Sequence, residues 1–341
     1  MVFFHPYTLF LAALVMVWPT SAPWAQDPGA APRLSLPIRC APGRDCWLVN
    51  FVDLDTGKGV ADYACAKRSY DGHKGTDIAI RDLVAMKNGV DVVASAGGVV
   101  KGMRDGMADV DVTVNGMPSV KGRECGNGLV VSHGAGWETQ YCHLRRGSVA
   151  VKKGDTIKRG QKLGLVGHSG KAQFPHVHLS VRHNKQVVGP FAGLGPRRAC
   201  AASKQSLWTD SALAALSVES TAIFNAGFSS AALKPKIARS GLMAGKQMSR
   251  RVPAIVLWAD MYWPTAGDNI RFRLTGPDGR VLLEKAIRVK KTQARRFIFV
   301  GKKRKTSQWP AGVYRGEIVL TRTGAKSKPV TISTNREVVL R

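Results

Sequence analysis

Residues 151–181 read VKKGDTIKRGQKLGLVGHSGKAQFPHVHLSV. This stretch holds two short apolar runs, at 162–166 and 176–181, and turn signals at Lys153-Gly154-Asp155 and Arg159-Gly160. Short β-like runs beside turn residues are typical of a β-rich fold, and no long helical period is present. The stretch therefore predicts several short strands that lie close together in the sequence.

The same pattern extends upstream. Residues 90–100 (VDVVASAGGVV) and 128–132 (GLVVS) are further apolar runs that include small residues. A chain of 341 residues suggests two domains as a prior. We therefore expect one β-rich domain over residues 26–200.

A second strand pattern follows in residues 201–341. Apolar residues and arginines alternate over residues 270–274, as in a strand that is buried on one face. Gly276-Pro277-Asp278-Gly279 is a strong turn signal, and a new apolar run begins at Val281. We predict an antiparallel β-sandwich here, immunoglobulin-like in size, so the fold class of the whole chain is mainly β.

Residues 1–25 have the pattern of a signal peptide. The apolar run LFLAALVMV at 9–17 is followed by small residues up to Ala25, and it is shorter than the roughly 20 residues that span a bilayer. The segment before it lacks Lys and Arg, so an uncleaved anchor or a buried N-terminal helix is the alternative. A cleaved leader predicts export to the periplasm or cell envelope.

Six cysteines follow the leader. An even number in an exported chain favours disulfides, although sequence leaves about fifteen pairings open. Cys40 and Cys46 flank a Pro-Gly turn and can pair locally, and Cys125 and Cys142 bracket a predicted hairpin. A cysteine zinc site is the weaker alternative because the chain has no C-x2-C pair.

The chain is strongly basic, with a net charge of +28. The excess is largest after residue 200, where 26 Lys and Arg residues stand against 8 Asp and Glu residues. A basic surface attracts polyanions. We expect an anionic wall polymer or a lipid surface as the partner of the C-terminal domain, and no nucleic acid. A solvated basic face without a specific ligand is the alternative.

Seven of the eight histidines lie between residues 73 and 183, which points to the first domain as the functional one. In His73-Lys74-Gly75-Thr76-Asp77, the glycine permits a turn that brings an imidazole and a carboxylate to one ion. In His176-Val177-His178, on a predicted strand, both imidazoles project from one face. Each segment alone also occurs as polar residues on a solvated surface.

His143 ends another predicted strand, in Tyr141-Cys142-His143-Leu144. A single histidine there would usually be structural. We expect His133 to pack or to cap a turn, and we assign no role to His168 or His183.

Together, and in this order, the three segments resemble those of the lysostaphin-type or LytM-type zinc endopeptidases, which cut peptide cross-bridges in peptidoglycan. The resemblance covers about residues 60–195 and includes the stretch that ends in Gly167-His168-Ser169-Gly170. It implies that His73, Asp77 and His178 bind one zinc ion per chain. His143 and His176 would then be catalytic, one as the base for the zinc-activated water and the other at the oxyanion, and this division stays open.

The resemblance implies a secreted zinc metalloendopeptidase whose partner and substrate is peptidoglycan. Two alternatives remain: a catalytically silent LytM-type regulator of other wall hydrolases, and a wall-binding module that acts through the basic domain. Residues 101–124 are longer than the family's usual linker. We expect this segment to form a wall of the substrate groove.

Overall fold

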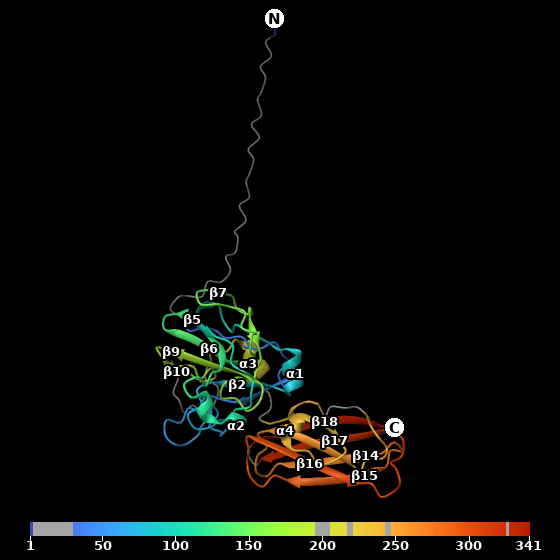
Figure 1. Cartoon of the computed structure of the whole chain (residues 1–341). Helices are drawn as coiled ribbons and strands as arrows, with labels where there is room; N and C mark the ends of the chain where they lie inside the picture. The colour runs from blue at the N-terminus through green and yellow to red at the C-terminus, as the bar shows by residue number, and fades with distance from the viewer. Residues whose placement is uncertain (3–29, 195–204, 217–220, 243–246, 325–326) are drawn as a thin grey trace.

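A computed structural model of the chain contains two β-rich lobes, an N-terminal one and a C-terminal one (Figure 1). It describes all residues except 3–29, 195–204, 217–220, 243–246 and 325–326. Cys200 and the predicted signal peptide, except for its residues 1 and 2, therefore lie outside the described residues. Within the described part of the chain, no helix has the length and apolar character needed to cross a membrane.

The N-terminal lobe is built on one antiparallel sheet. Its strands, in spatial order, are β1 (Cys46–Asn50), β2 (Thr76–Ile80), β9 (His176–His183), β6 (Trp137–Leu144), β5 (Asn127–Gly134), β4 (Gly98–Arg104) and β7 (Thr156–Ile157), with β10 (Gln186–Val187) paired to β9. A separate two-stranded sheet pairs β3 (Asp91–Val93) with β8 (Lys162–Leu165). The prediction of a mainly β fold is confirmed.

Side-chain alternation explains how β9 serves both a core and a site. Val177, Leu179 and Val181 are fully buried and belong to the main hydrophobic cluster of this lobe. The intervening residues, including His176 and His178, project from the other face of the sheet, as the period of two requires. One strand therefore holds the lobe together on one face and presents polar groups on the other.

Three short helical segments interrupt the strands of this lobe. They are α1 (Leu83–Asn88), α2 (Val112–Asn115) and the 3-10 turn η1 (Met117–Val120). The last two lie within the long segment 101–124, for which no helix was predicted.

The helix α3 (Asp210–Leu216) packs with the N-terminal lobe. Leu207, Trp208 and Leu216 lie in the same cluster as Leu34, and a parallel bridge joins Leu34 to Trp208. The domain boundary after residue 200 remains a prediction, and this packing leads us to propose that the first domain extends to Leu216.

The C-terminal lobe is a sandwich of two sheets. One sheet contains β11 (Ala222–Ser229), β13 (Ala254–Tyr262) and β16 (Arg295–Lys303). The other contains β12 (Gln247–Met248), β18 (Ser327–Leu340), β17 (Gly312–Gly324), β14 (Asn269–Thr275) and β15 (Val281–Arg288), and α4 (Pro235–Arg239) connects β11 to β12. The predicted hairpin around residues 276–279 is present as the antiparallel pair β14 and β15. One detail differs from the prediction, because β12 pairs with β18 in parallel.

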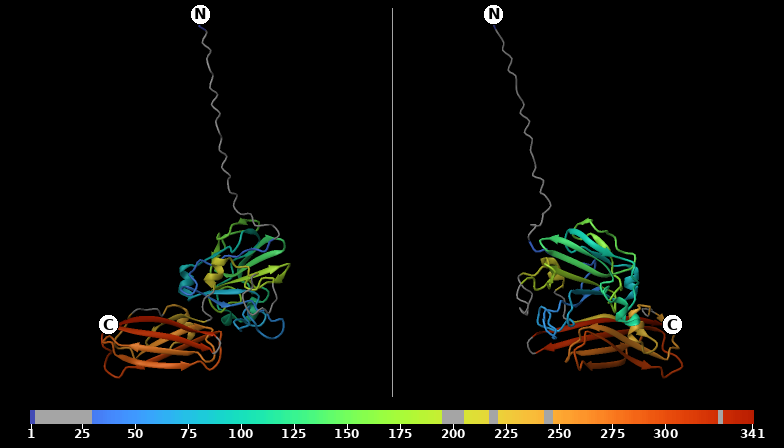
Figure 2. Two further views of the ribbon diagram at one scale, coloured as in Figure 1. Left: turned by 180° about the vertical axis from the view of Figure 1, so that it is seen from behind. Right: turned by 60° about the vertical axis from the view of Figure 1, so that its left-hand side comes forward.

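The two lobes touch through an aromatic cluster, and Figure 2 shows the sandwich lying against the N-terminal lobe. The buried residues of this cluster are Trp47, Val49, Ala79, Phe224, Tyr262 and Trp263. The Trp263 indole N–H donates a hydrogen bond to the Val49 carbonyl across the boundary. The sandwich is thus fixed to β1, the edge strand of the N-terminal sheet.

Both disulfides that the sequence favoured locally are present. Cys40 pairs with Cys46, and Cys125 pairs with Cys142. Cys65 is also disulfide-bonded. The described cysteines are therefore all oxidised, and none is available as a zinc ligand.

Candidate metal centre

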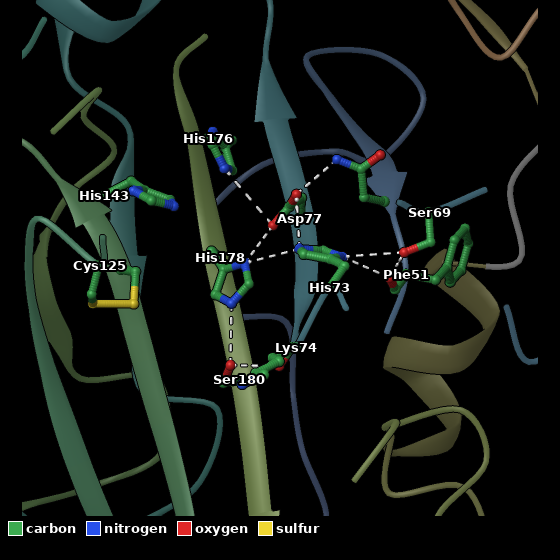
Figure 3. A network of polar contacts seen from close by, with 12 residues as sticks. Phe51, Ser69, His73, Lys74, Asp77, Cys125, His143, His176, His178 and Ser180 are labelled. Atoms are coloured by element: carbon green, nitrogen blue, oxygen red, sulfur yellow. Dashed lines mark hydrogen bonds and ion pairs between the residues drawn. A yellow bond between two sulfur atoms is a disulfide. The ribbon is translucent and has the colours of Figure 1, made fainter. Parts of the chain in front are cut away.

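The strand register places the metal-ligand candidates side by side. Strand β9 lies between β2 and β6, so that Asp77 pairs directly with His178, and His178 pairs with Cys142 on its other side. One ligand atom from each of His73, Asp77 and His178 lies within 4.8 Å of the other two. Figure 3 shows these three side chains converging on one point.

His73 is held in the tautomer that a metal ligand needs. Its Nδ1–H donates to the Phe51 carbonyl at 2.7 Å, which leaves the Nε2 lone pair 3.2 Å from Asp77 Oδ2. Burial opposes the charged form of His73, but the neighbouring Asp77 carboxylate raises its pKa overall. A cation at Nε2, whether a proton or a metal ion, is therefore favoured.

His178 is fixed in the complementary way. The Ser180 hydroxyl donates to the Lys74 carbonyl at 2.6 Å, so it must accept the hydrogen bond from His178 Nε2–H at 3.1 Å. The unprotonated Nδ1 then lies 2.7 Å from Asp77 Oδ1 and 3.2 Å from His73 Nε2. Acceptor atoms from three side chains thus face one another and need a cation between them.

Asp77 is buried at the centre of this group. Burial opposes its charged form, but His73, His176 and His178 hold the pKa of the Asp77 carboxyl well below its usual range. The Asn50 amide donates to Asp77 Oδ2 at 2.8 Å and orients the carboxylate. Two imidazole nitrogens and one carboxylate oxygen form a donor set that suits zinc and leaves a fourth position open.

Gly75 makes room for the His178 ring. A Cβ at this position would lie 2.4 Å from His178 Nε2, closer than real side chains approach. The glycine between His73 and Asp77 is therefore needed for space as well as for the turn that the sequence suggested.

His143 and His176 form a second pair beside the ligand candidates. Their ring centres lie 4.5 Å apart, and His176 Nε2 lies 3.8 Å from Asp77 Oδ1. Each donates its Nδ1–H to a backbone carbonyl, His143 to Ser169 at 2.7 Å and His176 to Phe174 at 2.8 Å. Burial lowers the pKa of both imidazoles, and neighbouring imidazoles lower that of His143 further. Both rings are neutral at pH 7 and carry a lone pair at Nε2.

The backbone at His143 is unusual. Its φ of +63° lies in the left-handed region, which is costly for a residue other than glycine. Its N–H donates to the Cys125 carbonyl at 2.8 Å, and the Cys125–Cys142 disulfide ties the preceding residue to the same loop. These two links hold the His143 ring beside His176.

The site opens into a groove of about 290 Å³. Asp77 and His176 line it, as do Val112 and Met117 from the segment 101–124. That segment therefore forms one wall of the groove, as the sequence analysis expected.

The remaining histidines lie elsewhere. His133 bridges the Gly97 carbonyl and the Thr139 hydroxyl, which matches the expected packing role. His183 stacks on Trp137. His168 is buried, and its Nε2 has no hydrogen-bond partner among the described residues.

Sequence reasoning missed the groups that orient the ligands. These are Asn50, the Phe51 carbonyl and Ser180. Ser180 continues the alternation of His176 and His178 along β9, so that pattern contained a signal for it. Asn50 reaches Asp77 through the pairing of β1 with β2, and the Phe51 carbonyl reaches His73 from just beyond the end of β1. No local pattern reveals either contact.

The donor set forms a candidate metal centre on an antiparallel sheet. Residues 71–190 match the sequence model of Peptidase family M23. This match confirms the resemblance to the LytM-type zinc peptidases for that part of the chain.

Two of the relatives are named as endopeptidases. The peptidoglycan DD-endopeptidase ShyB of Vibrio cholerae is 36% identical over 98 residues, covering 29% of this chain and 21% of that protein. The DD-carboxypeptidase/endopeptidase Mpg of Neisseria meningitidis is 32% identical over 109 residues, covering 31% and 22%. The chain thus matches only about a fifth of the length of these relatives.

Among solved structures, the chain is similar to a zinc-containing peptidase from Vibrio cholerae. The identity is 29%, the coverage is 38% of this chain and 32% of that one, and the TM-score is 0.28.

Proposed function

We propose that this protein is a secreted zinc metalloendopeptidase that hydrolyses stem peptides or cross-links of peptidoglycan. The observation that carries the proposal is the convergence of acceptor atoms from His73, Asp77 and His178. Their hydrogen bonds to Phe51, Asn50 and Ser180 leave the ligand atoms without a proton of their own.

His73 Nε2, one oxygen of Asp77 and His178 Nδ1 would hold the zinc ion. Bound there, zinc would acidify a water molecule and polarise the peptide carbonyl. Asn50 and Ser180 keep the carboxylate and the His178 ring in position, as outer partners of metal ligands commonly do.

His143 and His176 would move the protons. As neutral imidazoles with a free Nε2, either can accept a proton from the attacking water. The imidazolium so formed can stabilise the oxyanion or protonate the departing amine nitrogen. Their carbonyl partners, Ser169 and Phe174, fix the tautomer in which Nε2 is available. The order in which the two act is open.

Peptidoglycan is the substrate named for the relatives ShyB and ShyA of Vibrio cholerae. An enzyme of this class acts in the periplasm or cell envelope, which agrees with the predicted leader. The basic C-terminal sandwich would attract an anionic wall polymer or a lipid surface by long-range electrostatics. A silent regulator is less favoured because all five ligand and catalytic positions are filled by competent side chains.

The test is a digest of purified peptidoglycan by the mature protein, with and without a chelator. Wild type should release peptide-cleaved products, the chelator should stop the release, and added zinc should restore it. His143→Ala and His176→Ala should keep their zinc but lose about 100-fold or more in kcat. A zinc-loaded wild type that cleaves no peptidoglycan would rule the enzyme out in favour of the regulator.

A further inference from the structure

The C-terminal sandwich reaches the groove of the metal centre. Tyr262, the last residue of β13, and Ala294, just before β16, line the same groove as Asp77 and His176. The Tyr262 ring also stacks on Phe224 and packs against Phe174, whose centre lies 4.7 Å from that of His176. The second lobe therefore closes one side of the site.

Arg295 fixes this contact. Its guanidinium lies 5.2 Å from the Phe174 ring centre and 5.3 Å from that of Tyr262, within the range of a cation–π interaction. The same guanidinium pairs with the buried Asp260 carboxylate at 3.0 Å. Since the Phe174 carbonyl orients His176, the sandwich also stabilises the segment that holds a catalytic imidazole.

Tyr262 contributes its ring to the groove lining. The residue is 3% exposed, and its hydroxyl is buried without a hydrogen-bond partner among the described residues. Because the buried hydroxyl is closed to a bound peptide, the ring is the part of Tyr262 that a peptide in the groove can contact.

Lys171 supplies a positive charge on the groove. Its side chain is exposed, and its Nζ lies 5.8 Å from the centre of the Tyr70 ring, which packs on the ligand His73. In the described part of the chain, no carboxylate lies within ion-pair distance of Lys171. The exposed Glu124 feels its charge without pairing with it. Among the described residues, Asp77 is the only acidic one that lines the groove, and the metal would neutralise it.

We propose that the groove is shared by both domains and selects peptides that carry a free carboxylate beside the cleaved bond. Lys171 binds this carboxylate, and the Tyr262 ring packs against the peptide from the opposite domain. The rest of the lining is apolar or amide, with Val49, Val112 and Gln173, and suits small uncharged side chains. This inference rests on the proposed peptidase function and specifies its substrate.

The test measures binding apart from cleavage. The probes are a fluorescent stem peptide with free carboxylates and the same peptide with those carboxylates amidated. Each is titrated into the zinc-loaded full chain carrying His143→Ala, which would bind the peptide without cutting it. We expect this protein to bind the carboxylate peptide about tenfold more tightly than the amidated one.

Three variants in that background separate the roles. Lys171→Met should remove the preference, and Lys171→Arg should keep it. Tyr262→Leu, which removes the ring, should weaken the binding of both peptides equally. Lys153→Met, at an exposed lysine outside the groove lining, is the matched control and should bind as the parent does. Equal binding of both peptides by the parent, or unchanged binding by Lys171→Met and Tyr262→Leu, would overturn the inference.

The proposed function can fail separately. A wild type that discriminates between the peptides through Lys171 but never cleaves peptidoglycan would refute the enzyme and leave the shared groove in place. If the wild type cleaves peptidoglycan while the Lys171 and Tyr262 variants bind both peptides as the parent does, the shared groove is refuted and the enzyme stands.

Discussion

Individual side chains in this site are fixed by hydrogen bonds that leave one atom free for chemistry. His73 and His178 use opposite ring nitrogens to reach their protein partners, so opposite nitrogens face the metal position. The resemblance to the LytM-type family implied these three ligand candidates, through its H-x-x-x-D and H-x-H segments. It could not predict Asn50, which lies 27 residues from Asp77 and reaches it only through the pairing of β1 and β2.

Gly75→Ala tests the space beside His178. The added methyl group would overlap the imidazole and displace Nδ1 from the metal position, so we expect zinc affinity to fall about 10- to 100-fold. Metal competition with a chromophoric chelator measures this change. Gly102→Ala is the control, because its Cβ would meet no atom within 4 Å. Equal zinc affinity in Gly75→Ala and wild type would contradict the packing described.

The dependence of stability on pH gives a second prediction for a single residue, His133. Burial lowers the pKa of His133 in the folded protein below 6.5. As the pH falls, His133 of the unfolded chain is therefore protonated at a higher pH than His133 of the folded protein. The contribution of neutral His133 to the free energy of unfolding is therefore complete above pH 6.5. It is lost as the pH falls toward the pKa of His133 in the folded protein.

The Tm of the metal-free protein, followed from pH 7.5 to pH 5, measures this loss. His133→Asn, which can still donate to the Gly97 carbonyl, should show a smaller fall than wild type. An identical pH dependence in the two proteins would contradict the assignment.

Among the elements, β9 was the most predictable and β12 the least. The alternation of His176, Val177, His178 and Leu179 predicts a strand with two different faces, and the strand has them. β12 contains two residues and pairs in parallel with the end of the chain, so no local pattern could predict it. The attachment of α3 to the first lobe was also hidden, because it depends on Trp208 meeting Leu34 across the fold.

The Cys125–Cys142 disulfide gives a prediction at this scale. Replacing both cysteines by serine should lower the free energy of unfolding by about 3 kcal/mol, the value for a loop of this size. It should also lower kcat while the zinc content is retained, because the tie beside the strained His143 is lost.

The control is Cys40→Ser with Cys46→Ser, which opens a disulfide that does not adjoin His143 or His176. Urea unfolding and steady-state kinetics distinguish the two variants. If both lowered kcat equally, the disulfide beside His143 would have no special role in positioning it.

At the scale of the whole molecule, the two lobes form one unit around the aromatic cluster at their boundary. Composition and strand patterns predicted two β domains, but the contact between them joins residues more than 200 positions apart. Only the folded chain brings Tyr262 to the groove of the first lobe. The substrate preference inferred above therefore depends on a contact that no sequence pattern announces.

Trp263→Ala tests this coupling. The indole is 7% exposed and bonds to the Val49 carbonyl, so its loss should destabilise the boundary by about 3–5 kcal/mol. Calorimetry should then show two unfolding transitions in place of one. Phe299→Ala, at a ring that is 45% exposed in the same lobe, should leave the number of transitions unchanged. A single transition in Trp263→Ala would mean that the cluster does not couple the lobes.

The most direct test of the metal centre is the zinc content of the purified mature protein beside that of His178→Ala. Both proteins are prepared without chelators, and their zinc content is measured by atomic emission. The geometry of His73, Asp77 and His178 predicts about one zinc ion per wild-type chain and its loss in the variant. A wild type without zinc, or a variant that keeps the full amount, would contradict the assignment of these residues as the ligands.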